Sequence, residues 1–211
     1  ANKVRKYISV IINFAIRQDW LQSNPATVVQ REPVEGDGYT MWPADQVKRF
    51  RKRFVSGTRE RLALELAVYT GLARVDLVKA TRANIVDGRL EYRRKKTGLV
   101  GTFPIHPNLA AELAHVPDDQ LMLILTEYGK PFTPDGFGGW FAKARNRAEI
   151  DAGLSFHGLR KRVAADLAEA GATVPEIMAF LNDRSEKMAT LYVAQADKKA
   201  IGDRAIARLS R

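Results

Sequence analysis

The sequence contains no cysteine, so it offers neither a disulfide nor a thiolate ligand for a metal ion. It shows no secretory signal, and its longest apolar stretches, residues 8–16 and 121–125, are too short or too interrupted to span a bilayer. It also lacks an HExxH motif, a Cys/His cluster and an acidic metal triad. These absences predict a cytoplasmic protein that uses no metal and no other cofactor.

Positive charge is what the sequence has in excess. The chain carries 34 Lys and Arg against 24 Asp and Glu, a formal net charge of +10. Such a balance favours a polyanionic partner, nucleic acid first and an anionic membrane surface second. The basic residues gather in three runs, at residues 49–54, 92–98 and 157–162. One run is usually a solvated face, whereas three runs on separate elements favour a surface that follows phosphates.

The chain divides at a segment rich in Gly, Pro and charge, residues 31–40, which we interpret as a linker. Before it, apolar residues recur at helical spacing and predict an amphipathic helix over about residues 2–20, stopped by Ser23-Asn-Pro25. One helix cannot bury its own apolar face. Residues 1–30 are therefore expected to be the remnant of a separate domain, and residues 41–211 to be a domain with its own core.

Start and stop signals predict mostly helices in that second part. Thr58 and the capping box Thr173–Glu176 open helices, and Gly71 and Gly171 end them. Further helices are predicted to begin near Pro43, Arg74, Pro107, Pro134, His157, Ser185 and Asp197. Turns at residues 87–88 and 97–98 separate short strands, and residues 121–125 (LMLIL) read as a buried strand or helix end. The predicted fold class is mainly α with a small antiparallel β-sheet (α+β).

Three motifs in the second part resemble the tyrosine recombinase (phage integrase) family. His157-x-x-Arg160 opens a predicted helix, and Tyr192 follows about thirty residues later. YTGLARVDL (residues 69–77) is similar to the family's first arginine box, and KKTG (residues 95–98) to its β-hairpin lysine. The resemblance covers about residues 40–200 and implies the family's catalytic domain. Residues 1–30 look like the last helix of the DNA-clamping core-binding domain.

The resemblance implies a metal-independent, site-specific DNA recombinase that cleaves and rejoins strands. Tyr192 would attack a phosphodiester and form a 3′-phosphotyrosine link, which conserves the bond energy for rejoining. Arg160 and Arg74 would hold the non-bridging oxygens, because guanidinium forks stay charged and bind bidentately. His157 would assist, and Lys96 would protonate the leaving 5′-oxygen, with Lys95 as an alternative.

Two positions depart from the family pattern. When the chain is aligned to the family motif without gaps, the family's first arginine falls on Ala73. Arg74 follows one residue later, and on a helix one residue corresponds to a rotation of about 100°. Where the family has Gly-His or Gly-Trp, the chain has Asn182-Asp183. An ionised Asp183 cannot donate a hydrogen bond to a phosphate, so its expected role is to orient Tyr192 or His157.

Each site residue also has a structural interpretation. Arg160 and Lys96 could be solvated, His157 could cap a helix, and Tyr192 could be a core aromatic at helical spacing. At the level of function, the first alternative is a degenerate member that binds DNA without cutting it. A type IB topoisomerase-like enzyme and a helix-turn-helix regulator are further alternatives.

The resemblance also implies partners and a setting. The chain most resembles the integrases of bacterial mobile elements, which implies that it acts in the cytoplasm on double-stranded DNA. They assemble as tetramers on two DNA sites and exchange a C-terminal segment, here about residues 197–211. No membrane partner is expected.

Overall fold

A computed structural model describes residues 2–32, 38–194 and 196–209. The chain forms two compact units, Ala1–Gly38 and Tyr39–Arg211. Half of the predicted linker, residues 33–37, lies outside the described residues. The two units are described separately below.

The smaller unit consists of helix α1 (Asn2–Arg17) and the short 3₁₀ helix η1 (Pro25–Thr27). α1 confirms the predicted amphipathic helix and ends three residues early, where Asp19 takes a left-handed conformation (φ 59°). Asn24 caps η1 and ties it to α1, since its Nδ2 donates to Ser9 Oγ at 2.9 Å and to Asn13 Oδ1 at 2.6 Å. Large apolar side chains of this unit remain exposed: Val4, Tyr7, Ile8, Val10, Ile11, Phe14, Trp20, Leu21, Val28 and Val29.

A three-stranded antiparallel sheet in the larger unit confirms the predicted hairpins. Its order is β1 (Ile85–Val86), β2 (Arg89–Arg93) and β3 (Val100–Pro104). Asp87 and Gly88 both have positive φ, 49° and 70°, as a tight turn between β1 and β2 requires. Along β2 and β3 the buried residues alternate with exposed ones, so each strand presents one face to the core.

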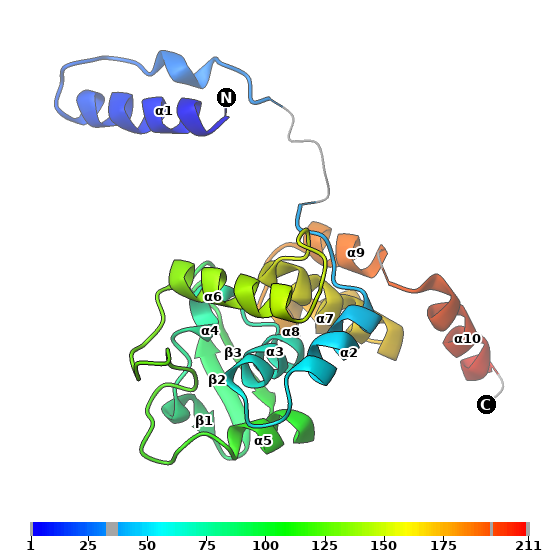
Figure 1. Cartoon of the computed structure of the whole chain (residues 1–211). Helices are drawn as coiled ribbons and strands as arrows, with labels where there is room; N and C mark the ends of the chain where they lie inside the picture. The colour runs from blue at the N-terminus through cyan, green and yellow to red at the C-terminus, as the bar shows by residue number, and fades with distance from the viewer. Residues whose placement is uncertain (1, 33–37, 195, 210–211) are drawn as a thin grey trace. The chain divides into compact units, whose positions relative to one another are not determined.

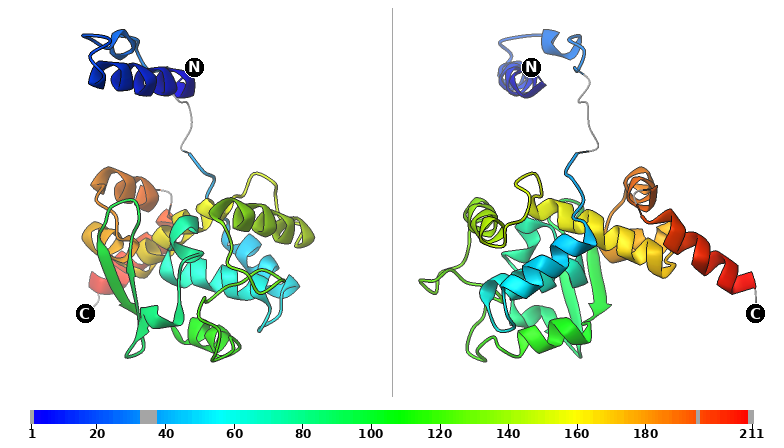
Figure 2. Two further views of the ribbon diagram at one scale, coloured as in Figure 1. Left: turned by 90° about the vertical axis from the view of Figure 1, so that its left-hand side faces the viewer. Right: turned by 45° about the vertical axis from the view of Figure 1, so that its right-hand side comes forward.

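Helices make up most of the larger unit (Figure 1). They are α2 (Ala44–Arg53), α3 (Arg59–Thr70), α4 (Arg74–Leu77), α5 (Pro107–Leu113), α6 (Pro134–Arg147), α7 (Phe156–Ala170), α8 (Val174–Leu181), α9 (Glu186–Ala194) and α10 (Lys198–Leu209), with a 3₁₀ turn η2 (Arg82–Asn84). In both views of Figure 2, α7 runs between α2 and α9. α7 packs against α3, α6, α8, α9 and α10, and it is buried along most of its length.

The caps show why these segments fold locally. Thr58 accepts a hydrogen bond from the Arg61 backbone, and Gly71 ends α3 in the left-handed region at φ 59°. Thr173 and Glu176 form the predicted capping box of α8. The core beneath the helices is aromatic, and its largest fully buried side chains are Trp42, Phe50, Phe137 and Phe141. The fold class is therefore mainly α with a small antiparallel sheet, as predicted.

One predicted element is wrong. Residues 121–125 form no strand and no helix end; Met122 and Leu125 make isolated bridges to Thr81 and Pro131. Leu123 and Ile124 are nevertheless buried, as the apolar run predicted. No helix in the described part of the chain is long and apolar enough to cross a membrane.

Candidate active site

Arg160 lies in the second turn of α7 and is only 3% exposed. Its Nη1 donates to the carbonyl of Gly71, at the end of α3, and its Nη2 donates to Leu181 O at 2.6 Å, at the end of α8. Terminal helix carbonyls have no partner within their helix and carry partial negative charge, so they hold a guanidinium well. Two helix ends thus fix Arg160 in the interior.

Asp183 connects Arg160 to a second buried arginine, Arg94. The Oδ2 atom of Asp183 lies 3.4 Å from Arg160 Nη2 and 3.2 Å from Arg94 Nη1. Although burial raises it, the pKa of Asp183 is held below its usual value by the charges of Arg94 and Arg160. The carboxylate is therefore ionised and shared between the two guanidinium groups.

The β2–β3 hairpin that carries Arg94 is attached to the end of α8. Arg94 Nη1 donates to Asn182 O at 2.7 Å, and Asn182 Nδ2 donates to Leu99 O at 2.9 Å. On the other side, the Lys95 backbone N–H donates to Asp76 Oδ1 of α4 at 3.0 Å. These bonds hold both arms of the turn, and Lys95 and Lys96 at its tip are exposed.

His157 lies in the first turn of α7, and the ring of Tyr39 packs against it with centroids 4.6 Å apart. Burial, together with the charges of Arg160, Arg94, Lys161 and Lys96, lowers the pKa of His157 to about 4. The imidazole is consequently neutral at pH 7 and able to accept a proton. Because their charges contribute to this lowering, Arg94 and Lys96 lie close enough to His157 to affect its pKa.

Tyr192 lies on α9 and is 4% exposed, packed in an apolar cluster with residues of α7 and α8. Burial raises its pKa, against the lowering effect of Arg160 and Arg94. The phenol is protonated at neutral pH in this structure. The packing of Tyr192 agrees with its interpretation as a core aromatic. The effect of the Arg160 charge on its pKa agrees with its interpretation as a catalytic residue.

Arg74 does not join Arg160. Its Nη2 forms a salt bridge of 3.0 Å with Asp135 at the start of α6, and the guanidinium lies over Gly138, where an added Cβ would meet Nη1 at 2.3 Å. We expected Arg74 to turn its guanidinium towards Arg160 and His157; as regards Arg160, the structure instead pairs Arg74 with Asp135. Arg74 and His157 do line one cavity of about 350 Å³. The physical reason is that α6 presents a carboxylate within reach of α4.

Of the six predicted site residues, the structure brings Arg160 and Asp183 into direct contact, and His157, Tyr192 and Lys96 into electrostatic range. Arg74 lies with α6 instead. The residue that the motifs missed is Arg94. A signal was present in the sequence, because Leu90 and Tyr92 occupy the buried face of β2 and the two-residue period puts position 94 on the same face.

All three basic runs supply intramolecular ion pairs, since Arg94 of the hairpin run already pairs with Asp183. Arg51 forms a salt bridge with Glu65 at 2.8 Å, and Arg162 pairs with Asp166 and Glu169 at 2.6 and 2.7 Å. Part of the positive charge that predicted a phosphate-following surface therefore stabilises the fold. The rest of the hairpin run, at Arg93, Lys95 and Lys96, stays exposed.

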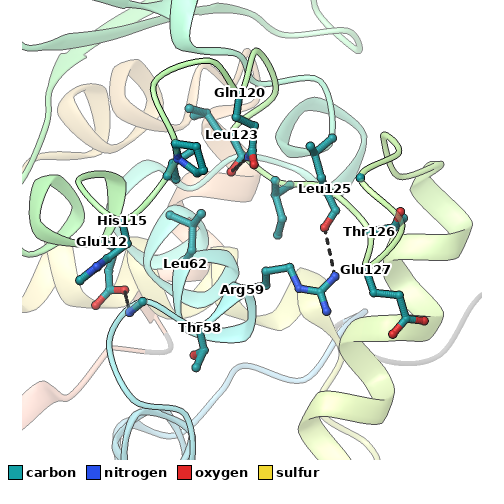
Figure 3. Close-up of a pocket in the computed structure, with 15 residues that line it drawn as sticks. Thr58, Arg59, Leu62, Glu112, His115, Gln120, Leu123, Leu125, Thr126 and Glu127 are labelled. Atoms are coloured by element: carbon teal, nitrogen blue, oxygen red, sulfur yellow. Dashed lines mark hydrogen bonds between the residues drawn. The ribbon is translucent and has the colours of Figure 1, made fainter.

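A cavity of about 400 Å³ lies elsewhere, between the start of α3 and residues 112–129 (Figure 3). The Gly57 backbone donates to Glu112 Oε2 at 3.0 Å, and Arg59 Nη1 donates to Leu125 O at 3.5 Å. None of the six predicted site residues lines it. Within the described ranges, no group of three or more His, Cys, Asp or Glu side chains is placed to hold a metal ion.

The sequence profile of the phage integrase family matches residues 43–199. The chain belongs to the phage integrase family.

Individual relatives share 14–26% sequence identity with this chain. Tyrosine recombinase XerC of Chlamydia caviae is 26% identical over 152 residues, which is 65% of this chain and 47% of that protein. The chain thus spans about half the length of this relative. A lambda integrase tetramer bound to a Holliday junction gives a TM-score of 0.72 at 23% identity, covering 93% of this chain and 58% of that one. XerA recombinase gives 0.68 at 14% identity, covering 97% and 81%. These structures share the fold.

Proposed function

We propose that the larger unit is the catalytic part of a site-specific DNA recombinase that cleaves and rejoins DNA through a 3′-phosphotyrosine intermediate. The observation that carries this proposal is Arg160, a guanidinium fixed by two helix ends with His157 one turn before it and Tyr192 within electrostatic range. Family membership and the DNA-bound lambda integrase of the same fold support a duplex DNA substrate.

In the proposed reaction, Tyr192 Oη attacks the scissile phosphorus, and the bond to the 5′-oxygen breaks. The guanidinium of Arg160 binds a non-bridging oxygen, whose charge grows in the transition state. Neutral His157 accepts the phenolic proton: its low pKa keeps the ring unprotonated at pH 7, and the negative charge of the bound phosphate is needed to raise that pKa so that the ring can act as a base. Lys96, exposed at the hairpin tip, donates a proton to the departing 5′-hydroxyl. Arg74, held by Asp135, reaches the phosphate only if that salt bridge opens.

Two further proposals concern the smaller unit and the assembly. We take the smaller unit as part of a DNA-clamping domain, because its helix leaves a broad apolar face exposed. We take about residues 197–211 as the segment exchanged in a tetramer, as the lambda integrase tetramer on a Holliday junction suggests. In this structure α10 packs on its own α7, with Arg204 donating to Ala168 O at 2.8 Å. Mass photometry with and without DNA tests the assembly.

A second candidate is a DNA-binding member that has lost cleavage. Two positions favour it. Asp183 places a negative charge beside Arg94 and Arg160, where a phosphate would have to bind. Ala73 has no guanidinium to bind a phosphate. Both candidates predict DNA binding, and only the first predicts covalent chemistry.

The deciding experiment uses nicked duplexes, selected from a random pool for binding, in which the cleaved strand end diffuses away. Wild-type protein should be trapped on the DNA, and Tyr192→Phe should bind equally well without any trapping, since the single oxygen removed is the attacking atom. Tyr128→Phe, an exposed tyrosine, is the matched control and should trap normally. Trapping by Tyr192→Phe would move the nucleophile elsewhere, with Tyr128 next to test. No trapping by wild type would favour the binder.

A further inference from the structure

We propose that Arg94 is the second arginine that binds the scissile phosphate, and that Asp183 occupies the place of a phosphate oxygen until DNA arrives. This inference rests on the proposed function. It concerns a residue that lies outside the recognised motifs and is placed at the site only by the fold.

The first argument is convergence. Arg94 Nη1 and Arg160 Nη2 approach the same atom, Asp183 Oδ2, at 3.2 and 3.4 Å. One anionic oxygen held by two guanidinium groups is the arrangement that a non-bridging phosphate oxygen requires. The two arginines are thus already spaced for such an oxygen.

The second argument is that Arg94 is held in place while Asp183 is replaceable. Arg94 is 4% exposed and donates to Asn182 O at 2.7 Å, a backbone group that DNA does not displace. The side chain of Asp183 is 12% exposed, and its contacts are longer than the 2.7–2.9 Å typical of strong charge-assisted pairs. A rotation of one side chain would therefore open the position between the arginines.

The third argument is charge. Two buried arginines share a single carboxylate here, and burial together with Arg94 lowers the pKa of Arg160 despite Asp183. The cluster therefore has an excess of buried positive charge, which a phosphate with its own negative charge would balance better than Asp183 alone. Within the described part of the chain, positions 73 and 74 do not supply this second charge, because position 73 is Ala and Arg74 is paired with Asp135.

Arg94 also has an unpaired donor. Its Nε is buried without a hydrogen-bond partner, next to a cavity of about 320 Å³ that Asp76 also lines. Asp76 Oδ2 likewise has no partner, so a water molecule between these two atoms would satisfy both. We assign the Nη1 edge of Arg94 to the phosphate and its Nε edge to this inner contact.

The test observes the arginine Nε–H signals by ¹⁵N–¹H NMR while inorganic phosphate is added to the whole chain. Arg94→Lys and Arg160→Lys assign the two signals by removing them. We expect both signals to shift and saturate at a common phosphate concentration. Asp183→Asn should lower that concentration about tenfold, because a like charge no longer competes for the position. A shift of Arg160 without Arg94, or no shift of either, would overturn the proposal.

A second arm measures the rate of covalent trapping. Arg94→Gln should slow it roughly 10²-fold, as deletion of a donor to the transition state does. Arg89→Gln, an exposed arginine at the other end of β2 and outside the three basic runs, should leave it within about twofold. Equal rates for the two variants would overturn the role of Arg94 and leave the proposed function intact. If wild type traps no DNA, the proposed function fails, and the phosphate titration still decides whether Arg94 binds the anion.

Discussion

Two clusters in the larger unit place a carboxylate between two arginines, and they differ in how completely the charges are matched. Glu65 is 1% exposed and forms salt bridges of 2.8 Å with Arg51 and 2.5 Å with Arg61. Asp183 is 12% exposed and meets Arg94 and Arg160 at 3.2 and 3.4 Å. The first cluster has short contacts from both carboxylate oxygens, whereas the second has longer contacts to one oxygen.

The pKa values move in opposite directions in the two clusters. The hydrogen bond to Glu65 raises the pKa of Arg51 and outweighs burial. Burial and Arg94 lower the pKa of Arg160. A second acid, Glu112, lies 3.9 Å from Arg61, so the Glu65 cluster has an acid for each arginine. The comparison indicates that matched charges stabilise a fold, while an unmatched positive charge at a partly open position is suited to bind an anion.

Arg160→Lys should give the largest effect that separates the clusters. The charge remains, but the fork that reaches Gly71 O and Leu181 O is lost. Covalent trapping should slow by roughly 10²–10³-fold. Arg61→Lys removes the guanidinium that donates to Glu65 Oε1 and to the carbonyls of Arg51 and Phe54, and it should leave trapping within about threefold. Equal losses in the two variants would mean that general destabilisation, and not phosphate binding, explains the effect.

Glu65→Gln should be the most destabilising change of an acid. It leaves two arginines without their carboxylate, and we expect the free energy of unfolding to fall by about 3 kcal/mol. Urea unfolding followed by circular dichroism measures it, with the exposed Glu91→Gln as the control. A loss below about 1 kcal/mol would show that the Glu65 cluster is no more structural than an exposed pair.

Asp183→Asn should cost less, about 1 kcal/mol, because the carboxylate is partly exposed and the amide oxygen can still accept a hydrogen bond. The same urea measurement applies. A loss as large as that of Glu65→Gln would remove the contrast between the clusters and make Asp183 a structural residue.

The smallest effect is a shift of the His157 titration. The ¹H signal of its ring should report a pKa of about 4 in the free protein, and Arg94→Gln should raise it by removing one of the nearby positive charges. Since this pKa lies below the usual histidine value of 6.5, the unfolded chain takes up the proton first, and stability is lost as the pH falls from 6.5 towards 4. An unchanged pKa in Arg94→Gln would place Arg94 outside the electrostatic range of the site.

Local signals predicted much of the fold. Thr58, Gly71 and the Thr173–Glu176 box act through neighbouring backbone groups, so their sequence alone fixed where helices begin and end. The segment 121–125 failed because an apolar run does not say whether a neighbouring strand is available to pair with it. Burial could be read from the sequence there, and pairing could not.

The same distinction holds at the candidate site. His157, Arg160 and Tyr192 could be recognised in the sequence because their order and spacing resemble the family's motifs. The partner of Arg74 depends on where α6 begins in space, far along the chain, and no local pattern encodes this. Arg94 lay on a readable strand face, but its contact with Asp183 joins residues 89 positions apart.

Asn182 closes α8 in a left-handed conformation (φ 52°, ψ 44°) that glycine adopts more readily. Its carbonyl and amide hold Arg94 and Leu99, and its neighbour Asp183 completes the link. Positions 94, 182 and 183 are therefore expected to be energetically coupled. Asn182→Gly removes the amide bond to Leu99 O but keeps the carbonyl that accepts from Arg94, whereas Asp183→His removes the carboxylate that the two arginines share. Substitutions at these positions should lower the free energy of unfolding by amounts that do not add.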